Sequence, residues 1–160
     1  YWNIPPGILK NEVLPAIRRN PSYLERNDME WYNGGIRQRP GDRNPLGLVK
    51  FLFPNNYSIY LHDTPSKTLF KQTKRAFSHG CIRISEPVRL AEWLLRADST
   101  WTTDRIFSAM HSGKEKYVTL NQSVPVFIGY FTAWVDADGR LNFRDDIYGH
   151  DKKMIKKMFD

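Results

Sequence analysis

Residues 61–84 read LHDTPSKTLFKQTKRAFSHGCIRI and contain the single cysteine of the chain, Cys81. Two histidines precede the cysteine in the same stretch, His62 by nineteen positions and His79 by two. One cysteine cannot form an internal disulfide, so the chemistry of Cys81 depends on its neighbours. Three interpretations are open at this point: a buried small side chain, a metal ligand, or a nucleophile.

The segments around this stretch predict an α+β fold. Two short runs of β-branched and aromatic residues, LVKFLF (48–53) and YSIYLH (57–62), are separated by PNN, which favours a hairpin turn. HGCIRI (79–84) can enter a third strand, which would place the cysteine at the end of a strand. SEPVRLAEWLLRA (85–97) is typical of a helix, because Ser85 can cap it and its apolar residues share one face.

The rest of the chain adds helices near its start and strands towards its end. Short helices are predicted up to about Trp31, and a long loop rich in Gly, Pro, Asn and Arg over residues 33–47. A second helix is predicted to begin near Thr103 and to end at Gly113. Three later runs have the composition of strands: KYVTL (116–120), VPVFIGYFTAWV (124–135) and LNF (141–143). The expected fold is a mixed, mainly antiparallel sheet with helices gathered to one side.

Composition places the chain among ordinary globular proteins. Its 160 residues, 41% hydrophobic and 26% charged, suit one domain rather than two. No window approaches twenty apolar residues, so no transmembrane helix is predicted. The opening YWNIPPGILKNE has neither an initiator Met nor the pattern of a signal peptide. We therefore expect an excised domain whose targeting signal lies outside this chain.

The formal net charge of +7 favours acidic partners such as nucleic acid, anionic lipid or an anionic wall polymer. The basic residues are scattered, however, and concentrate only at IRRN (17–20), IRQRPGDR (36–43) and HDKKMIKKMF (150–159). They form no motif that reads nucleic acid. We therefore interpret most of this charge as solvated surface and expect no nucleic-acid partner.

A nucleophilic role for Cys81 would require an activating group, because a thiol with an ordinary pKa of about 8.5 is only slightly ionised at neutral pH. A nearby imidazole can accept the proton. Gly80 leaves room for a substrate carbonyl, and backbone N–H groups at that turn could hold the developing oxyanion. In an extended segment Cys81, Arg83 and His79 face the same way, which would place a carboxylate clamp beside the thiol.

A zinc site built from His62, His79 and Cys81 is the main chemical rival. Zinc usually takes four protein ligands, or three and a water, and no Cys-x-x-Cys or His-x-x-x-His pair accompanies these residues. His111 and His150 lie in a predicted helix end and a polar tail, and we expect both on the surface. The residues alone leave the nucleophile and the buried small side chain about equally favoured.

The same stretch resembles the signature of the L,D-transpeptidase catalytic domain, also called the YkuD domain. That signature is a His, a gap of some fifteen residues, Ser/Thr-His-Gly-Cys, an apolar residue, and Asn or Arg. Here His62 is followed by fifteen residues and then by Ser78, His79, Gly80, Cys81, Ile82 and Arg83. Other segments, including YWNIPPGIL (1–9) and RLAEWLL (89–95), resemble the larger Gram-negative periplasmic branch of the family.

The resemblance covers nearly the whole chain and implies one catalytic domain over residues 1–160 without the first strands of the family fold. In the similar branch, the segment before RPG forms a cap over the active site. We therefore expect a cap-like or lid-like segment over about residues 1–45 and a catalytic core over about residues 46–150. The implied fold is a mixed or antiparallel sheet with helices on one side and a helical or loop cap.

The resemblance also implies a reaction. Cys81 would attack the carbonyl of the third residue of a peptidoglycan stem peptide, expel D-Ala, and pass the acyl group to a neighbouring stem as a 3→3 cross-link. His62 would be the base, with its ring oriented by the backbone carbonyl of Asp63. The N–H groups of Gly80 and Cys81, together with the Tyr60 hydroxyl, would bind the oxyanion.

The remaining expectations also follow from the resemblance. Arg83, His79 and Ser78 are expected to contact substrate, no metal or organic cofactor is needed, and carbapenems are expected inhibitors. The compartment would be the periplasm, with a membrane contact only through an N-terminal anchor outside the chain. Alternatives are an L,D-carboxypeptidase, a D-amino-acid exchanger or a lipoprotein-attaching enzyme of the same fold, or a non-catalytic wall-binding module.

Overall fold

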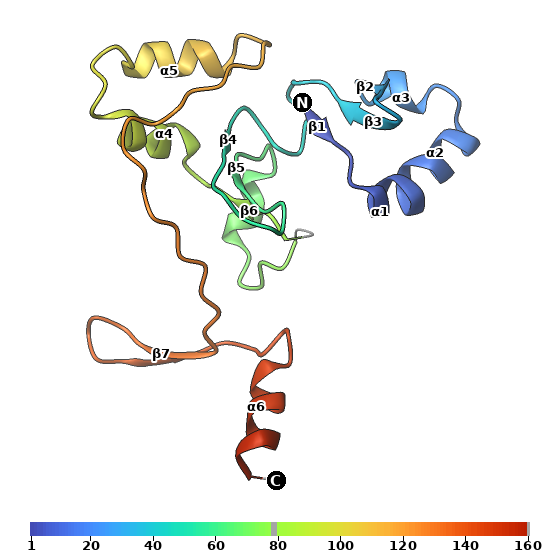
Figure 1. Cartoon of the computed structure of the whole chain (residues 1–160). Helices are drawn as coiled ribbons and strands as arrows, with labels where there is room; N and C mark the ends of the chain where they lie inside the picture. The colour runs from blue at the N-terminus through green and yellow to red at the C-terminus, as the bar shows by residue number, and fades with distance from the viewer. Residues whose placement is uncertain (78–79, 160) are drawn as a thin grey trace. The chain divides into compact units, whose positions relative to one another are not determined.

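The computed structural model describes residues 1–77 and 80–159, which form two compact units divided after Ser123. The first unit contains β1 (Trp2–Asn3), α1 (Pro6–Ile8), the π-helix η1 (Leu9–Val13), α2 (Leu14–Arg19), α3 (Tyr23–Arg26), β2 (Met29–Tyr32), β3 (Gly35–Gln38), β4 (Lys50–Phe51), β5 (Leu61–His62), the 3-10 helix η2 (Lys67–Lys71), β6 (Ile82–Arg83), α4 (Pro87–Leu95) and α5 (Thr103–Met110). The second contains β7 (Ala133–Val135), β8 (Leu141–Phe143) and α6 (His150–Phe159) (Figure 1). The predicted α+β class, with antiparallel and mixed sheets, is confirmed. The predicted division into cap and core stays a prediction.

The beginning of the chain folds around its own apolar cluster. Strands β1, β3 and β2 form an antiparallel sheet in that order. Ile4, Val13 and Ile36 are buried together, and partly buried side chains from α1, η1, α2 and α3 pack against them. The predicted short helices are therefore present, and their apolar residues close over one sheet.

The prediction of a continuous loop over residues 33–47 was wrong at its start. Asn33 and Gly34 both have positive φ, 48° and 76°, and they close a two-residue hairpin between β2 and β3. An Asn-Gly pair is the residue combination that such a turn favours, because both positions need a left-handed backbone. The same hairpin places Trp31 in a strand, so the predicted helical region ends earlier, at Arg26.

The second sheet of the first unit carries the residues of the sequence signature. Strand β4 pairs antiparallel with β5, with Lys50 opposite His62, as the predicted hairpin requires. Strand β5 pairs parallel with β6, with His62 opposite Arg83. All three strands contain two residues and are shorter than predicted. The sheet, in the order β4-β5-β6, is mixed because one pairing is antiparallel and the other is parallel.

Helices α4 and α5 follow this sheet. The predicted cap at Ser85 was wrong: the N-cap of α4 is Glu86, without a side-chain cap hydrogen bond, and Pro87 occupies the first turn, where a missing N–H costs nothing. Helix α5 begins at Thr103 as predicted and is capped by the hydroxyl of Thr102, but it ends before the predicted Gly113. The buried Ala91 and Ile106 hold one face of each helix away from solvent.

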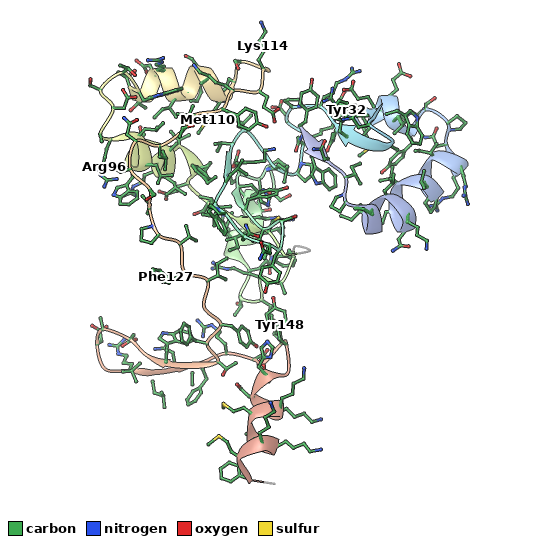
Figure 2. All side chains as sticks on the ribbon, viewed as in Figure 1. Tyr32, Arg96, Met110, Lys114, Phe127 and Tyr148 are labelled. Atoms are coloured by element: carbon green, nitrogen blue, oxygen red, sulfur yellow. The ribbon has the colours of Figure 1, made fainter. Side chains whose placement is uncertain are left out.

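In the second unit, β7 and β8 form an antiparallel hairpin around the predicted DADG turn, and α6 is the predicted C-terminal helix. The strands predicted at 116–120 and over most of 124–135 were wrong, because those segments pair with no other strand among the described residues. Alternating apolar side chains favour an extended conformation, but a strand also needs a neighbouring strand to pair with. Phe127 in the second of these segments is consequently 91% exposed (Figure 2). Every helix within residues 1–77 and 80–159 is too short or too polar to span a bilayer.

Gly47 is a position where the fold depends on the absence of a side chain. Its φ is +59°, and a Cβ there would lie 2.5 Å from Cγ and 2.6 Å from Cβ of Asp63. We expect Gly47→Ala to lower the free energy of unfolding by about 2–5 kcal/mol, because a left-handed alanine costs about 1–2 kcal/mol and overpacking about 1–3 kcal/mol. Urea unfolding followed by tryptophan fluorescence measures the loss.

Gly34→Ala is the matched control for Gly47→Ala. Gly34 also has a positive φ, +76°, but a Cβ there would meet nothing within 4 Å. This variant is expected to lose only the backbone contribution of about 1–2 kcal/mol. Equal losses for the two variants would contradict the close packing of Gly47 against Asp63.

Candidate active site

The pairing of β5 with β6 brings the two halves of the signature together. Two backbone hydrogen bonds fix the register, from Ile82 N–H to Tyr60 O at 3.1 Å and from Ile84 N–H to His62 O at 2.8 Å. Alternate residues of a strand share one face, and paired residues of neighbouring strands point to the same face. That face therefore carries four predicted site residues: Tyr60, His62, Cys81 and Arg83.

The Tyr60 hydroxyl interacts directly with Cys81. Burial, followed by the charge of Cys81 and a side-chain hydrogen bond with it, raises the pKa of Tyr60 to about 12. The phenol therefore keeps its proton at neutral pH and can donate it in a hydrogen bond. The Tyr60 and His62 rings lie edge to face, with centroids 6.0 Å apart. Cys81 as a residue is partly exposed.

His62 is 4% exposed and has a defined tautomer. Its Nδ1 is hydrogen-bonded to the backbone carbonyl oxygen of Asp63. Because a carbonyl oxygen only accepts, Nδ1 carries the proton and Nε2 keeps its lone pair. Burial and the charge of Arg83 hold the pKa of His62 below its ordinary value, although the contacts with Asp63 oppose them. The imidazole is therefore a neutral base at neutral pH.

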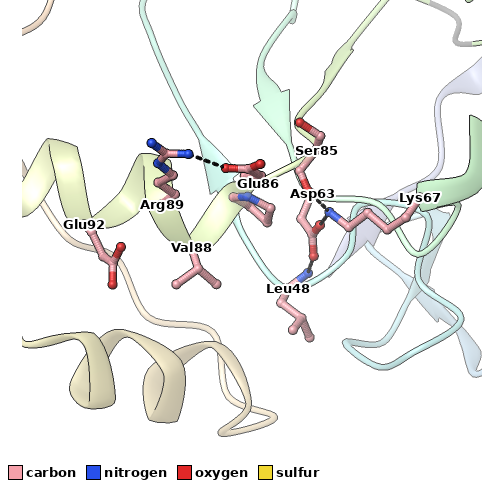
Figure 3. Close-up of a pocket in the computed structure, with 9 residues that line it drawn as sticks. Leu48, Asp63, Lys67, Ser85, Glu86, Val88, Arg89 and Glu92 are labelled. Carbon is pink, nitrogen blue, oxygen red and sulfur yellow. Dashed lines mark hydrogen bonds and ion pairs between the residues drawn. The ribbon is translucent and has the colours of Figure 1, made fainter. Parts of the chain in front are cut away.

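Asp63 points away from this face, because it follows His62 in an extended segment. Its N–H donates to Val49 O at 2.9 Å, which extends the β4–β5 pairing by one residue. Its carboxylate accepts from Leu48 N–H at 3.0 Å and from Lys67 Nζ at 2.6 Å. These groups border an open cavity of about 590 Å³ next to α4 (Figure 3).

Among the described residues, the Arg83 guanidinium donates one hydrogen bond and has two donors without a partner. Its Nη2 donates to Phe77 O at 3.3 Å, while Nε and Nη1 are buried and find no hydrogen-bond partner among the described residues. Buried N–H groups without a partner are costly, and a guanidinium matches a carboxylate in two-pronged geometry. The chemistry of these unpaired donors suits a carboxylate.

Gly80, Ser78 and His79 are the remaining residues that the sequence predicted for the site. Gly80 has a φ of +131°, a conformation that favours glycine, and a Cβ there would meet nothing within 4 Å. Backbone conformation is thus a second reason for this glycine, besides room for a substrate. The predicted residues Ser78 and His79 lie outside the described residues. The zinc alternative needs His79 and therefore stays untested.

Sequence analysis did not single out Lys67, although it contacts Asp63 and the chain after β6. The usable signal was a lysine four residues after the aspartate, but nothing in the spacing showed that β6 would lie beside it. His111, predicted on the surface, is exposed and bonds Phe107 O within α5.

Two comparisons with known proteins agree with this geometry. The model of the L,D-transpeptidase catalytic domain family (YkuD) matches residues 1–128. The chain is also similar to a protein of Haemophilus influenzae that carries the name "Putative L,D-transpeptidase", with 31% identity over 174 aligned positions. The alignment covers 96% of this chain and 35% of the relative, so the chain spans about a third of that protein.

Proposed function

The chain belongs to the L,D-transpeptidase catalytic domain family, and on this premise we propose that it forms 3→3 cross-links between peptidoglycan stem peptides through a thioester at Cys81. The observation that supports this proposal best is the parallel pairing of β5 with β6, which puts His62 and Cys81 on one face of a sheet. Peptidoglycan as substrate follows from the family. The periplasm is the compartment that fits that substrate.

The first half of the reaction acylates the enzyme. His62 Nε2 takes the proton from Cys81 Sγ, and the thiolate attacks the carbonyl carbon of the third stem residue. The Tyr60 hydroxyl and the N–H groups of Gly80 and Cys81 stabilise the resulting oxyanion. The C–N bond to D-Ala breaks as the intermediate collapses, and its nitrogen takes the proton from the imidazolium. A thioester at Cys81 and free D-Ala are the products.

The second half transfers the acyl group. The side-chain amine of a neighbouring stem loses a proton to His62 Nε2 and attacks the thioester carbonyl. The C–S bond then breaks, and the sulfur of Cys81 takes the proton from the imidazolium. The new amide is the 3→3 cross-link, and no cofactor takes part in either half.

Arg83 is the proposed contact for a stem carboxylate. We expect Arg83→Met to raise KM for a tetrapeptide stem about 10–100-fold, because a charged hydrogen-bonded partner is lost. The effect on kcat should be smaller, since the carboxylate is bound in both the ground and transition states. Steady-state release of D-Ala measures both constants.

Arg89→Met controls for the loss of one positive charge, because Arg89 is exposed on α4 and pairs only with Glu86 among the described residues. Its KM is expected to match the wild type. A stem whose carboxylates are amidated should give similar KM values for the wild type and Arg83→Met. A large KM difference with the amidated stem would contradict the carboxylate contact.

Product analysis with purified tetrapeptide stems tests the proposed transfer. Cross-linked dimers formed together with released D-Ala would support it. Release of D-Ala with only tripeptide as the second product would instead indicate a carboxypeptidase, and incorporation of an added D-amino acid an exchange enzyme. A non-catalytic wall-binding module would bind stems without releasing D-Ala.

A further inference from the structure

The carbonyl that orients His62 belongs to a residue fastened at three points. Asp63 is 6% exposed, and its N–H, Oδ1 and Oδ2 all have partners. The N–H and Oδ2 tie it to the segment that contains Leu48 and Val49. Oδ1 meets the Lys67 ammonium at 2.6 Å (Figure 3). Because its backbone N–H and both of its carboxylate oxygens are fixed, Asp63 has little freedom to turn the carbonyl that it presents to His62.

Lys67 also reaches the strand that carries the other half of the site. Besides Asp63, its Nζ donates to Ile84 O at 3.1 Å and to Ser85 O at 3.0 Å. An ammonium has three protons, and these three acceptors use all of them. One side chain from η2 thus links the end of β5 to the chain immediately after β6.

We propose that Lys67 is a positioning residue that fixes the direction of the His62 ring and the alignment of β5 with β6, and through them the geometry between His62 and Cys81. Lys67 contacts the carboxylate of Asp63, whose carbonyl accepts from the imidazole, on the face of β5 opposite to His62. It touches neither the reacting sulfur nor the imidazole. The proposal rests on the proposed function for its catalytic consequence, but its structural part can be tested separately.

Local packing makes this link necessary. The side chain of Asp63 is 8% exposed, so without Lys67 its carboxylate would lose the ammonium that it contacts and retain a hydrogen bond to a backbone N–H. A buried carboxylate in that condition draws water or turns outward. An outward turn of this side chain shifts the backbone of Asp63 and with it the peptide unit after Asp63, whose carbonyl oxygen is the acceptor of Nδ1. Gly47 lies close to the same carboxylate, since a Cβ at this position would be 2.5 Å from its Cγ.

The tautomer of His62 is the direct readout. In long-range proton–nitrogen NMR spectra of the histidine-labelled protein, we expect wild-type His62 to show one tautomer with the proton on Nδ1. Lys67→Met is expected to show a mixture of both tautomers and to slow acylation of Cys81 by a carbapenem about 10–100-fold. Lys67→Arg, which keeps the charge, should recover part of both. A variant lacking His62 assigns the signal.

Lys71→Met is the matched control, because Lys71 lies one turn on in η2, is exposed and loses the same charge. It should keep the wild-type tautomer and acylation rate. The double variant Asp63→Asn/Lys67→Met has no unpaired buried carboxylate. It replaces Lys67→Met in the test if that variant does not fold. It still lacks the Lys67 contacts with residue 63, Ile84 O and Ser85 O that hold the end of β5 to the chain after β6, so it is also expected to show mixed tautomers.

The two readouts separate this proposal from the proposed function. Mixed tautomers in folded Lys67→Met support the positioning role, whether or not the wild type is acylated. A wild type that is not acylated would count against the transpeptidase proposal alone. A pure Nδ1–H tautomer together with wild-type acylation in folded Lys67→Met, or in the double variant, would overturn the positioning role and leave the transpeptidase proposal intact.

Discussion

Replacing Cys81 with alanine is expected to reduce the release of D-Ala from tetrapeptide stems by at least about 10⁴-fold, to the background of the assay. The acyl group is bonded to this sulfur between the two halves of the reaction, and no other residue in the chain is a cysteine. A chromatographic assay of D-Ala and of cross-linked dimers measures the loss. Binding of stems should persist, since Arg83 remains.

Folding must be checked for the same variant. Cys81 is partly exposed, and alanine is smaller, so Cys81→Ala should keep the wild-type circular dichroism spectrum and thermal midpoint. Cys81→Ser is a second control, because its hydroxyl fits the site but is a much weaker nucleophile at neutral pH. Turnover by folded Cys81→Ala within tenfold of the wild type would contradict the role of the thiol.

Replacing His62 with alanine is expected to slow acylation of Cys81 about 10²–10⁴-fold, the usual contribution of a general base. Stopped-flow measurement of acylation by a carbapenem isolates this step from transfer. His111→Ala is the matched control, because His111 lies exposed at the end of α5 and bonds only its own helix among the described residues. It should acylate at the wild-type rate.

The pH dependence distinguishes loss of a base from general damage. Since burial and the charge of Arg83 lower the pKa of His62 below 6.5, the imidazole is still mostly neutral at pH 6.5. Wild-type acylation should therefore persist at pH 6.5 and fall only as the pH drops through the lowered pKa. In His62→Ala this acidic limb should disappear. An unchanged limb in that variant would assign it to another group.

Local patterns in the sequence were sufficient for the elements that carry the site. The run before His62 and the run after Gly80 both formed strands, and β4 and β5 paired as the hairpin predicted. The parallel pairing of β5 with β6 depends on residues about twenty positions apart. Sequence spacing alone could not show it, although it determines which side chains share a face.

Other features depend on partners that a local pattern does not contain. The strand predicted over 124–135 formed only from Ala133 onward, because a ladder needs a neighbour as well as alternating side chains. The β2–β3 hairpin, in contrast, was signalled by Asn33 and Gly34 and was missed within a segment interpreted as loop. The contacts of Lys67 could not be predicted either, because they depend on the chain after β6 lying beside it.

The most direct test of the central claim is intact-protein mass spectrometry of the wild type and Cys81→Ala after exposure to a carbapenem. The wild type is expected to gain the mass of one inhibitor molecule, which peptide mapping should place on Cys81, whereas Cys81→Ala should gain none. A folded wild type that gains no mass, or a Cys81→Ala variant that gains as much, would contradict the assignment of Cys81 as the nucleophile.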